Sequence, residues 1–436
     1  MSTNASAATF SLSDSDPNSA EFRRRFLASH GVNEAIEPKL TVDDRPLQEA
    51  IMPWIRTDPR RAIQLIEADL KPDTNPAFLN ILGSLYYQIS DYQNAERYMR
   101  QALEKFPSLR RSWRTLALCL VQRERLEQAI APLLKVIELG GGDAQSYGLL
   151  AYAYLNTEKY ESALAAYRMA RMFNPDSFDF RRGQAMCLLQ TEQLRSAIAL
   201  FDELITEKPE ETSFWVAQAN AFLTTERTDD AIANLQMLAD SGRASWSSLT
   251  MLGDLYLNND VPNLALNSYL EALKTHPPKD KSQAIRPLKY LLARKLYPEA
   301  QTYYQSVEAS TAGELDSESK RELSIALAKI EMSIGDTQKA LAILTKAVEE
   351  DPLDGASLML LGEHHLEEKD YPTSEYYFER ATAVREVAAE AYISLGRLQV
   401  DQGNLKASLV PLRKAKQLQP TSNLQRYIES IEQALD

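Results

Sequence analysis

Residues 76–107, PAFLNILGSLYYQISDYQNAERYMRQALEKFP, decide the fold of this chain. Apolar residues recur there three and four positions apart in two successive runs, which predicts two amphipathic helices. The closing proline predicts the end of the second helix, because proline lacks an N–H and clashes with the preceding turn. The stretch therefore encodes a helix–turn–helix unit that cannot bury both of its apolar faces alone.

The same pattern returns every 34 residues. A large residue, a Leu-Gly pair or a small substitute, an aromatic residue, an Ala and usually a Pro keep fixed offsets in segments that begin at Pro76, Arg110, Ala144, Phe178, Thr212 and Trp246. Small residues such as Gly83 and Ala95 allow paired helices to approach closely. A weaker unit with a polar extension at 308–317 follows, and the pattern then resumes at Arg321, Gly355 and Ala389.

This pattern is similar to the tetratricopeptide repeat (TPR), a 34-residue helix–turn–helix unit with W-x2-L-G-x2-Y, A-x3-F and P landmarks. The first full copy carries its landmarks at Leu79, Leu82, Gly83, Tyr86, Tyr92, Ala95, Met99, Ala102 and Pro107. The resemblance covers about ten tandem repeats over residues 43–421. It implies an all-α fold, a right-handed α-solenoid of stacked antiparallel helix pairs.

The irregular positions predict five segments. They are a disordered tail with a short N-terminal helix (1–42), an N-terminal sub-array (43–279), a degenerate repeat with an insertion that forms a seam (280–319), a C-terminal sub-array (320–421) and a capping helix (422–436). The short helix falls at residues 21–28, EFRRRFLA. We interpret it as a cap or docking arm, with a basic recognition segment as the alternative.

Composition excludes several classes of protein. Acidic residues outnumber basic ones by 61 to 48, so the net charge of -13 disfavours nucleic-acid binding, which needs a basic surface. Two cysteines cannot form a disulfide framework, and no secretory signal or apolar run long enough to span a membrane is present. These features predict a cytoplasmic protein without a transmembrane segment.

No catalytic motif stands in a supporting context. GxxxxGK[ST], GxGxxG, GxSxG and HExxH are absent, and the glycine run at 140–142 is interpreted as a helix cap. Cys119 and Cys187 lie in apolar helical runs, which indicates buried side chains, and the adjacent His364 and His365 diverge on a helix. We therefore expect no enzymatic activity, no cofactor and no metal site.

The resemblance implies a ligand groove lined by variable positions of the first helices. Those positions carry Asn80, Ser84, Tyr87, Arg111, Arg114, Gln122, Tyr152, Asn156, Arg182, Gln190, Asn220, Asp254 and Asn258. Amides and Arg could hold an extended peptide and its carboxylates, and a merely solvated surface is the alternative. The family's Lys/Asn carboxylate clamp is replaced here by Asn80 and Ser84. Reversing Arg114 and Arg182 to Glu is expected to abolish capture of an acidic or C-terminal peptide.

The acidity of the chain is concentrated in its C-terminal part. Residues 51–200 carry a net charge of +3, whereas residues 201–436 carry -13. A second, acidic face is predicted at Glu363, Glu367, Glu390 and Asp401, beside Lys329 and Arg397.

These patterns favour a non-enzymatic interaction scaffold or adaptor that binds another protein or a peptide segment in its groove, within a multiprotein assembly. Two alternatives stay open. One is a structural protein that self-associates into homo-oligomers, and the other is a regulatory subunit of a separate enzyme.

Overall fold

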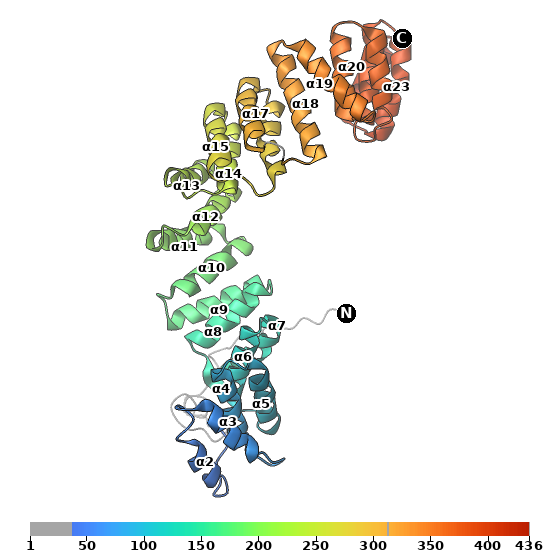
Figure 1. The fold of residues 1–436 in the computed structure, drawn as a ribbon. Helices are drawn as coiled ribbons and strands as arrows, with labels where there is room; N and C mark the ends of the chain where they lie inside the picture. Colours follow the sequence, from blue (N-terminus) through green and yellow to red (C-terminus); the bar gives the residue numbers. More distant parts are fainter. Residues whose placement is uncertain (1–36, 312–313, 436) are drawn as a thin grey trace. The chain divides into compact units, whose positions relative to one another are not determined.

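The computed structural model describes residues 37–311 and 314–435, and every regular element in these residues is a helix (Figure 1). The chain divides into two compact units, Met1–Arg227 and Thr228–Asp436. The short helix predicted at 21–28 lies outside the described residues. The all-α fold is confirmed.

Within each unit, consecutive helices are joined by short turns and stack as pairs, the arrangement of an α-solenoid. The first unit contains α2 (Arg45–Ile51), α3 (Pro59–Ala68), α4 (Pro76–Gln88), α5 (Tyr92–Lys105), α6 (Arg110–Gln122), α7 (Leu126–Val136), the π-helical turn η2 (Ile137–Gly141), α8 (Ala144–Asn156), α9 (Tyr160–Phe173), α10 (Phe178–Gln190), α11 (Leu194–Glu207) and α12 (Thr212–Thr224). The second contains α13 (Thr228–Asp240), α14 (Trp246–Asn258), α15 (Pro262–Thr275), the 3-10 turn η3 (Lys281–Ala284), α16 (Ile285–Ala293), α17 (Tyr297–Thr311), α18 (Ser317–Ile334), α19 (Thr337–Glu350), α20 (Gly355–Glu367), α21 (Tyr371–Ala381), α22 (Ala388–Asp401), α23 (Leu405–Leu418) and α24 (Ser422–Gln433).

The 34-residue spacing locates the first helix of each repeat. The six segment starts predicted from Pro76 to Trp246 are the first residues of α4, α6, α8, α10, α12 and α14. At Arg321, where the repeat pattern resumes, the helix starts earlier than the pattern. α18 begins four residues before it, at Ser317, where the Asp316 carboxylate accepts the N–H of Ser319 and caps the helix. Within the π-helical turn, Gly140 leaves the helical conformation with a left-handed φ of 78°, which confirms that this glycine run ends the helix.

The insertion expected as a polar loop is helical over its first four residues. Residues 308–311 continue α17, because Val307 and Thr311 are both buried on one helix face and the Thr311 hydroxyl donates to the Val307 carbonyl over 2.8 Å. α16 packs against both α17 and α18. The boundary between the two units falls instead between Arg227 and Thr228, so the seam at 280–319 stays a prediction.

The turn between the two helices of a pair has a recurring backbone conformation. One turn residue is left-handed, with a φ of 54–64° at Ser90, Glu124, Glu158, Glu192, Glu226 and Asp260, which are spaced 34 residues apart. In the first of these turns the N–H of Asp91 donates to the Tyr86 carbonyl and the N–H of Ser90 to Tyr87, the pattern of a Schellman motif. Glycine takes the left-handed position at Gly335 and Gly403 in the second unit.

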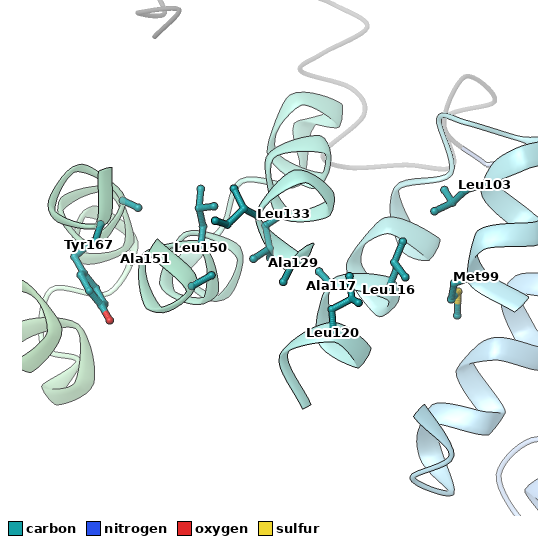
Figure 2. Close-up of a cluster of buried hydrophobic side chains, with 14 of the residues drawn as sticks. Met99, Leu103, Leu116, Ala117, Leu120, Ala129, Leu133, Leu150, Ala151 and Tyr167 are labelled. Carbon is teal, nitrogen blue, oxygen red and sulfur yellow. The ribbon is translucent and has the colours of Figure 1, made fainter. Parts of the chain in front are cut away.

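The core lies between the stacked helices. Figure 2 shows part of it in the first unit, where Met99, Leu116, Leu133 and Leu150 point into the space between neighbouring helices. Phe201 in the first unit and Phe378 in the second are fully buried. At the end of the chain, α24 buries the residues Leu424, Ile428 and Ile431.

Both cysteines belong to the core of the first unit. Cys119 and Cys187 are the tenth residues of α6 and α10, and both are fully buried. Burial raises the pKa of each thiol to about 12. Their predicted role as small buried hydrophobic residues is confirmed.

Candidate functional site

A groove of about 840 Å³ lies along the first helices of three consecutive repeats in the first unit. We call it the α8–α12 groove. Its principal lining residues are Gln145, Gly148, Leu149, Tyr152, Asn156, Asp179, Phe180, Arg182, Gly183, Met186, Ser213 and Phe214. Three residues of the sequence-based site, Tyr152, Asn156 and Arg182, lie in it together.

Two glycines inside helices make room for the aromatic floor of this groove. A Cβ atom on Gly148 would lie 2.4 Å from Cε1 of Phe180, and one on Gly183 would lie 2.1 Å from Cζ of Tyr167. Both distances are far below van der Waals contact, so any side chain there would displace a ring. Neither glycine occupies the eighth helix position, where Gly83 and its counterparts serve the packing of each repeat.

The floor is apolar and open to solvent. Tyr152 is 45% exposed and Met186 is 37% exposed, although both are large apolar side chains. Polar groups stand beside them, because the Arg182 guanidinium pairs loosely with Asp179 over 3.4 Å and the Asn156 amide donates to the Tyr152 carbonyl over 2.8 Å. The groove can therefore take an apolar side chain and orient charged neighbours.

A smaller pocket of about 400 Å³ brings together Asn80, Ser84, Arg111 and Arg114 between α4 and α6. The Ser84 hydroxyl donates to the Asn80 carbonyl over 2.8 Å, and Ser112 donates to the Asn80 side-chain oxygen over 2.9 Å. Arg111 forms an ion pair with Glu37 over 2.8 Å.

Arg114 has a structural partner. Its guanidinium donates to the Asp143 carboxylate over 2.6 Å and to the Ser146 hydroxyl over 3.2 Å, which joins α6 to the start of α8. Burial acts to raise the pKa of Asp143, but hydrogen bonds from Ser146 and Arg114 outweigh it and lower that pKa. Arg114 is therefore already neutralised within the fold, and its role in partner binding stays a prediction.

The remaining predicted residues do not converge on the α8–α12 groove. Tyr87 packs its ring near Tyr92, with centroids 5.5 Å apart, whereas Gln122, Gln190 and Asn220 are exposed at other places on their helices. In the second unit, Asp254 accepts hydrogen bonds from Tyr269 and Arg286, both over 2.7 Å, and Asn258 accepts one from Arg294 over 2.9 Å.

A second groove, of about 770 Å³, lies along α16, α18 and α20 in the second unit. We call it the α16–α20 groove. Its charged and polar lining consists of Lys289, Lys295, Glu322, Lys329, Glu363, His364, Glu367 and Glu368. Of the predicted acidic face, Glu363 and Glu367 line this groove, and Glu390 and Asp401 lie on α22, outside it.

Like charges crowd Glu363. Burial raises the pKa of its carboxyl, and the negative charges of Glu390 and Glu367 raise it further against the opposing effect of Lys329 and Arg397. Another charged pair in the groove is satisfied internally, since Lys289 and Glu322 approach to 2.6 Å.

Among the described residues, no group of three or more His, Cys, Asp or Glu side chains is placed to hold a metal ion. His365 pairs instead with Asp370 over 3.3 Å. In residues 37–311 and 314–435, no helix combines the length and apolar character needed to cross a membrane.

Sequence reasoning missed Gly148, Phe180, Gly183 and Met186 as groove residues. The available signal was glycine inside a helix at positions that the repeat does not require, since a helical glycine costs about 1 kcal/mol relative to alanine. Such a cost indicates a close approach by a neighbouring group.

Comparisons with known proteins agree with the fold. The sequence profile described as tetratricopeptide repeat matches residues 82–144, 149–212 and 325–383. No curated protein matches the chain.

Several solved structures are similar to parts of this chain. A tetratricopeptide repeat protein from Parabacteroides merdae is 16% identical, with 54% of this chain and 94% of that chain covered and a TM-score of 0.35. MamA from Desulfovibrio magneticus RS-1 is 17% identical, with 40% and 99% covered and a TM-score of 0.35. YrrB, described as a TPR protein with an unusual peptide-binding site, is 16% identical, with 47% and 95% covered and a TM-score of 0.37. The repeat spacing, the helix pairs and the matched profile together place this chain among the tetratricopeptide repeat proteins.

Proposed function

We propose that this protein is a non-enzymatic interaction scaffold that binds an extended segment of a partner protein in the α8–α12 groove. The observation that carries the proposal is the exposed apolar floor around Tyr152 and Met186, beside which two helical glycines admit the rings of Phe180 and Tyr167. A monomeric protein gains nothing from exposing such side chains along a concave surface, whereas a partner that covers them gains free energy.

The geometry suits a segment with one large apolar anchor. Burial of such a side chain contributes about 1.5–3 kcal/mol, which corresponds to roughly a 10- to 100-fold gain in affinity. The Asp179–Arg182 pair would then fix the direction of the segment by exchanging its weak internal contact for a charged group of the ligand.

The test uses peptides selected from a random library against the full chain, with binding followed by fluorescence anisotropy. Met186→Glu places a charge on the apolar floor and should weaken binding at least about 10-fold. Met172→Glu is the matched control, because Met172 is 74% exposed in the same unit and lies outside the groove. Equal loss in both variants, or no loss in Met186→Glu, would contradict the proposal.

Arg182→Glu is the charge test of the same groove. Arg114→Glu is a poor probe, because it breaks the ion pair with Asp143 that joins two repeats. The homo-oligomer and regulatory-subunit alternatives stay predictions, and light scattering across a range of protein concentrations tests the first of them.

A further inference from the structure

The described part of the chain begins beside α4 and α6, the first helices of the two repeats that precede the groove. Glu37 pairs with Arg111 in the first turn of α6, over 2.8 Å. Two residues later, the carbonyl of Lys39 accepts a hydrogen bond over 2.8 Å from Asn75, which is the N-cap of α4. Followed toward its N-terminus, the chain therefore passes from the start of α4 to the start of α6, and this course leads toward the start of α8.

Beyond α6, the starts of the next first helices form one edge of the α8–α12 groove. Arg111 is the second residue of α6, and the second residues of the next three first helices, Gln145, Asp179 and Ser213, all line the groove. Arg114 already bridges α6 to the start of α8. The row of helix starts that holds Glu37 is thus the same row that borders the groove.

The preceding segment is long enough to reach it. Neighbouring packed helices are about 8–10 Å apart, so α10 lies about 20 Å beyond α6. A stretch of ten residues spans at most about 33 Å when extended. Residues 22–27 precede Glu37 by at least that many positions.

The chemistry of this segment complements the groove. Its sequence, FRRRFL, combines two phenylalanines and a leucine with three consecutive arginines. The apolar floor offers Tyr152 and Met186 to the phenylalanines. Exposed acids stand at or next to the helix starts that border the groove, namely Asp176, Asp179, Glu210 and Glu211, and they outnumber the one exposed base among the described residues of the groove lining, Arg182.

We infer that residues 22–27 dock in the α8–α12 groove of the same chain and occupy it until a partner segment displaces them. The inference rests on the proposed function, because the same groove serves both segments. It assigns the ligand class of the groove as a basic, aromatic segment.

The tether makes even weak docking effective. A short flexible connection gives an effective concentration in the millimolar range. A segment with an intrinsic dissociation constant of about 100 μM would then fill the groove about 90% of the time, which lowers the apparent affinity for a partner about 10-fold.

Photocrosslinking in the full chain tests the docking directly. With p-benzoylphenylalanine in place of Phe26, mass spectrometry should map crosslinks to the groove residues of α8, α10 or α12, and Met186→Glu should remove them. The same probe in place of Phe10 is the control, and its crosslinks should not be enriched at groove residues. Mixing isotope-labelled with unlabelled copies distinguishes crosslinks within one chain from crosslinks between two chains. Crosslinks between copies, crosslinks outside the groove, or a yield equal to the control would overturn the inference.

Peptide binding separates this inference from the proposed function. The charge-reversed variant Arg23→Glu/Arg24→Glu/Arg25→Glu leaves the groove intact and should bind library-selected peptides about 10-fold more tightly than the native chain. Equal binding by both chains would overturn the docking while the proposed function stands. If neither chain selects a peptide but Phe26 still crosslinks to the groove, the docking stands and the proposed function fails.

Discussion

The two grooves of this protein have nearly the same size but differ in their charged side chains. The α8–α12 groove measures about 840 Å³ and has an aromatic and methionine floor. The α16–α20 groove measures about 770 Å³ and combines apolar residues such as Leu292, Met332 and Leu360 with several lysine and glutamate side chains. The repeat geometry sets the size of both grooves, because each groove follows the first helices of consecutive repeats. The few side chains between the packing landmarks set what each groove can bind.

Internal pairing separates the grooves further. In the α16–α20 groove the Lys289–Glu322 pair is closed at 2.6 Å, so part of its charge is already neutralised. In the α8–α12 groove the Asp179–Arg182 ion pair is longer, at 3.4 Å, and Tyr152 is exposed beside it. The comparison shows that the number of charges in a groove is a poor measure of what is available to a ligand.

The strongest test of the comparison removes the core beneath one groove at a time. Phe201→Ala in the first unit and Phe378→Ala in the second each delete a fully buried ring and should lower the free energy of unfolding by about 3–5 kcal/mol. Urea denaturation measures the loss. Phe173→Ala is the control and should cost less than about 1 kcal/mol, because this ring is 53% exposed. If peptide binding disappears in Phe378→Ala but survives in Phe201→Ala, the ligand binds in the α16–α20 groove, which contradicts the proposed function.

A smaller effect distinguishes the turns that have glutamate at the left-handed position from the turns that have glycine there. Glu158 holds a left-handed conformation with a φ of 60°, which glycine adopts without steric cost, so Glu158→Gly should stabilise the protein by about 0.5–1 kcal/mol. Gly335→Ala should destabilise by a similar amount, because its φ of 93° strains any other residue. Thermal unfolding measures both changes. Glu161→Gly is the control within α9, where glycine should destabilise. Destabilisation by Glu158→Gly would mean that its carboxylate makes a contact of its own.

The smallest effect is a pH dependence confined to the α16–α20 groove. The pKa of Glu363 lies above its ordinary value of 4.5, so the folded state binds this proton more tightly than the unfolded state. Stability from this site should therefore fall as the pH rises through the raised pKa. Glu363→Gln should remove that slope and add about 0.2–0.5 kcal/mol near neutral pH. Denaturation at about pH 5 and pH 7 measures both, with Glu349→Gln on α19 as control, and an unchanged slope would show that the crowding of Glu363 has no thermodynamic effect.

Sequence periodicity predicts the helices well because each repeat places its landmarks at constant offsets. The first residues of α4, α6, α8, α10, α12 and α14 follow from the spacing alone. The start of α18 does not, because Asp316 caps the helix one turn before the landmark pattern resumes. Local capping, which the repeat pattern does not encode, decides that boundary.

Groove membership was harder to predict from the sequence. Tyr152, Asn156 and Arg182 meet as expected, but Arg114 is held by Asp143, which lies in a connection between repeats. The position of a residue within its repeat indicates which way its side chain points. It does not indicate whether an irregular loop supplies a partner for that side chain. The floor depends on Gly148 and Gly183, whose effect is visible only through the rings they admit.

Labelling of the two cysteines can report local opening of the helices in the first unit. They stand at equivalent positions in α6 and α10, and each thiol combines full burial with a pKa raised to about 12. A thiolate-directed reagent at neutral pH can therefore label Cys119 or Cys187 only after the surrounding helices separate. Cys187 belongs to a helix that lines the α8–α12 groove and Cys119 to one that does not, so the ratio of their labelling rates measures how far a ligand in that groove protects its own repeat.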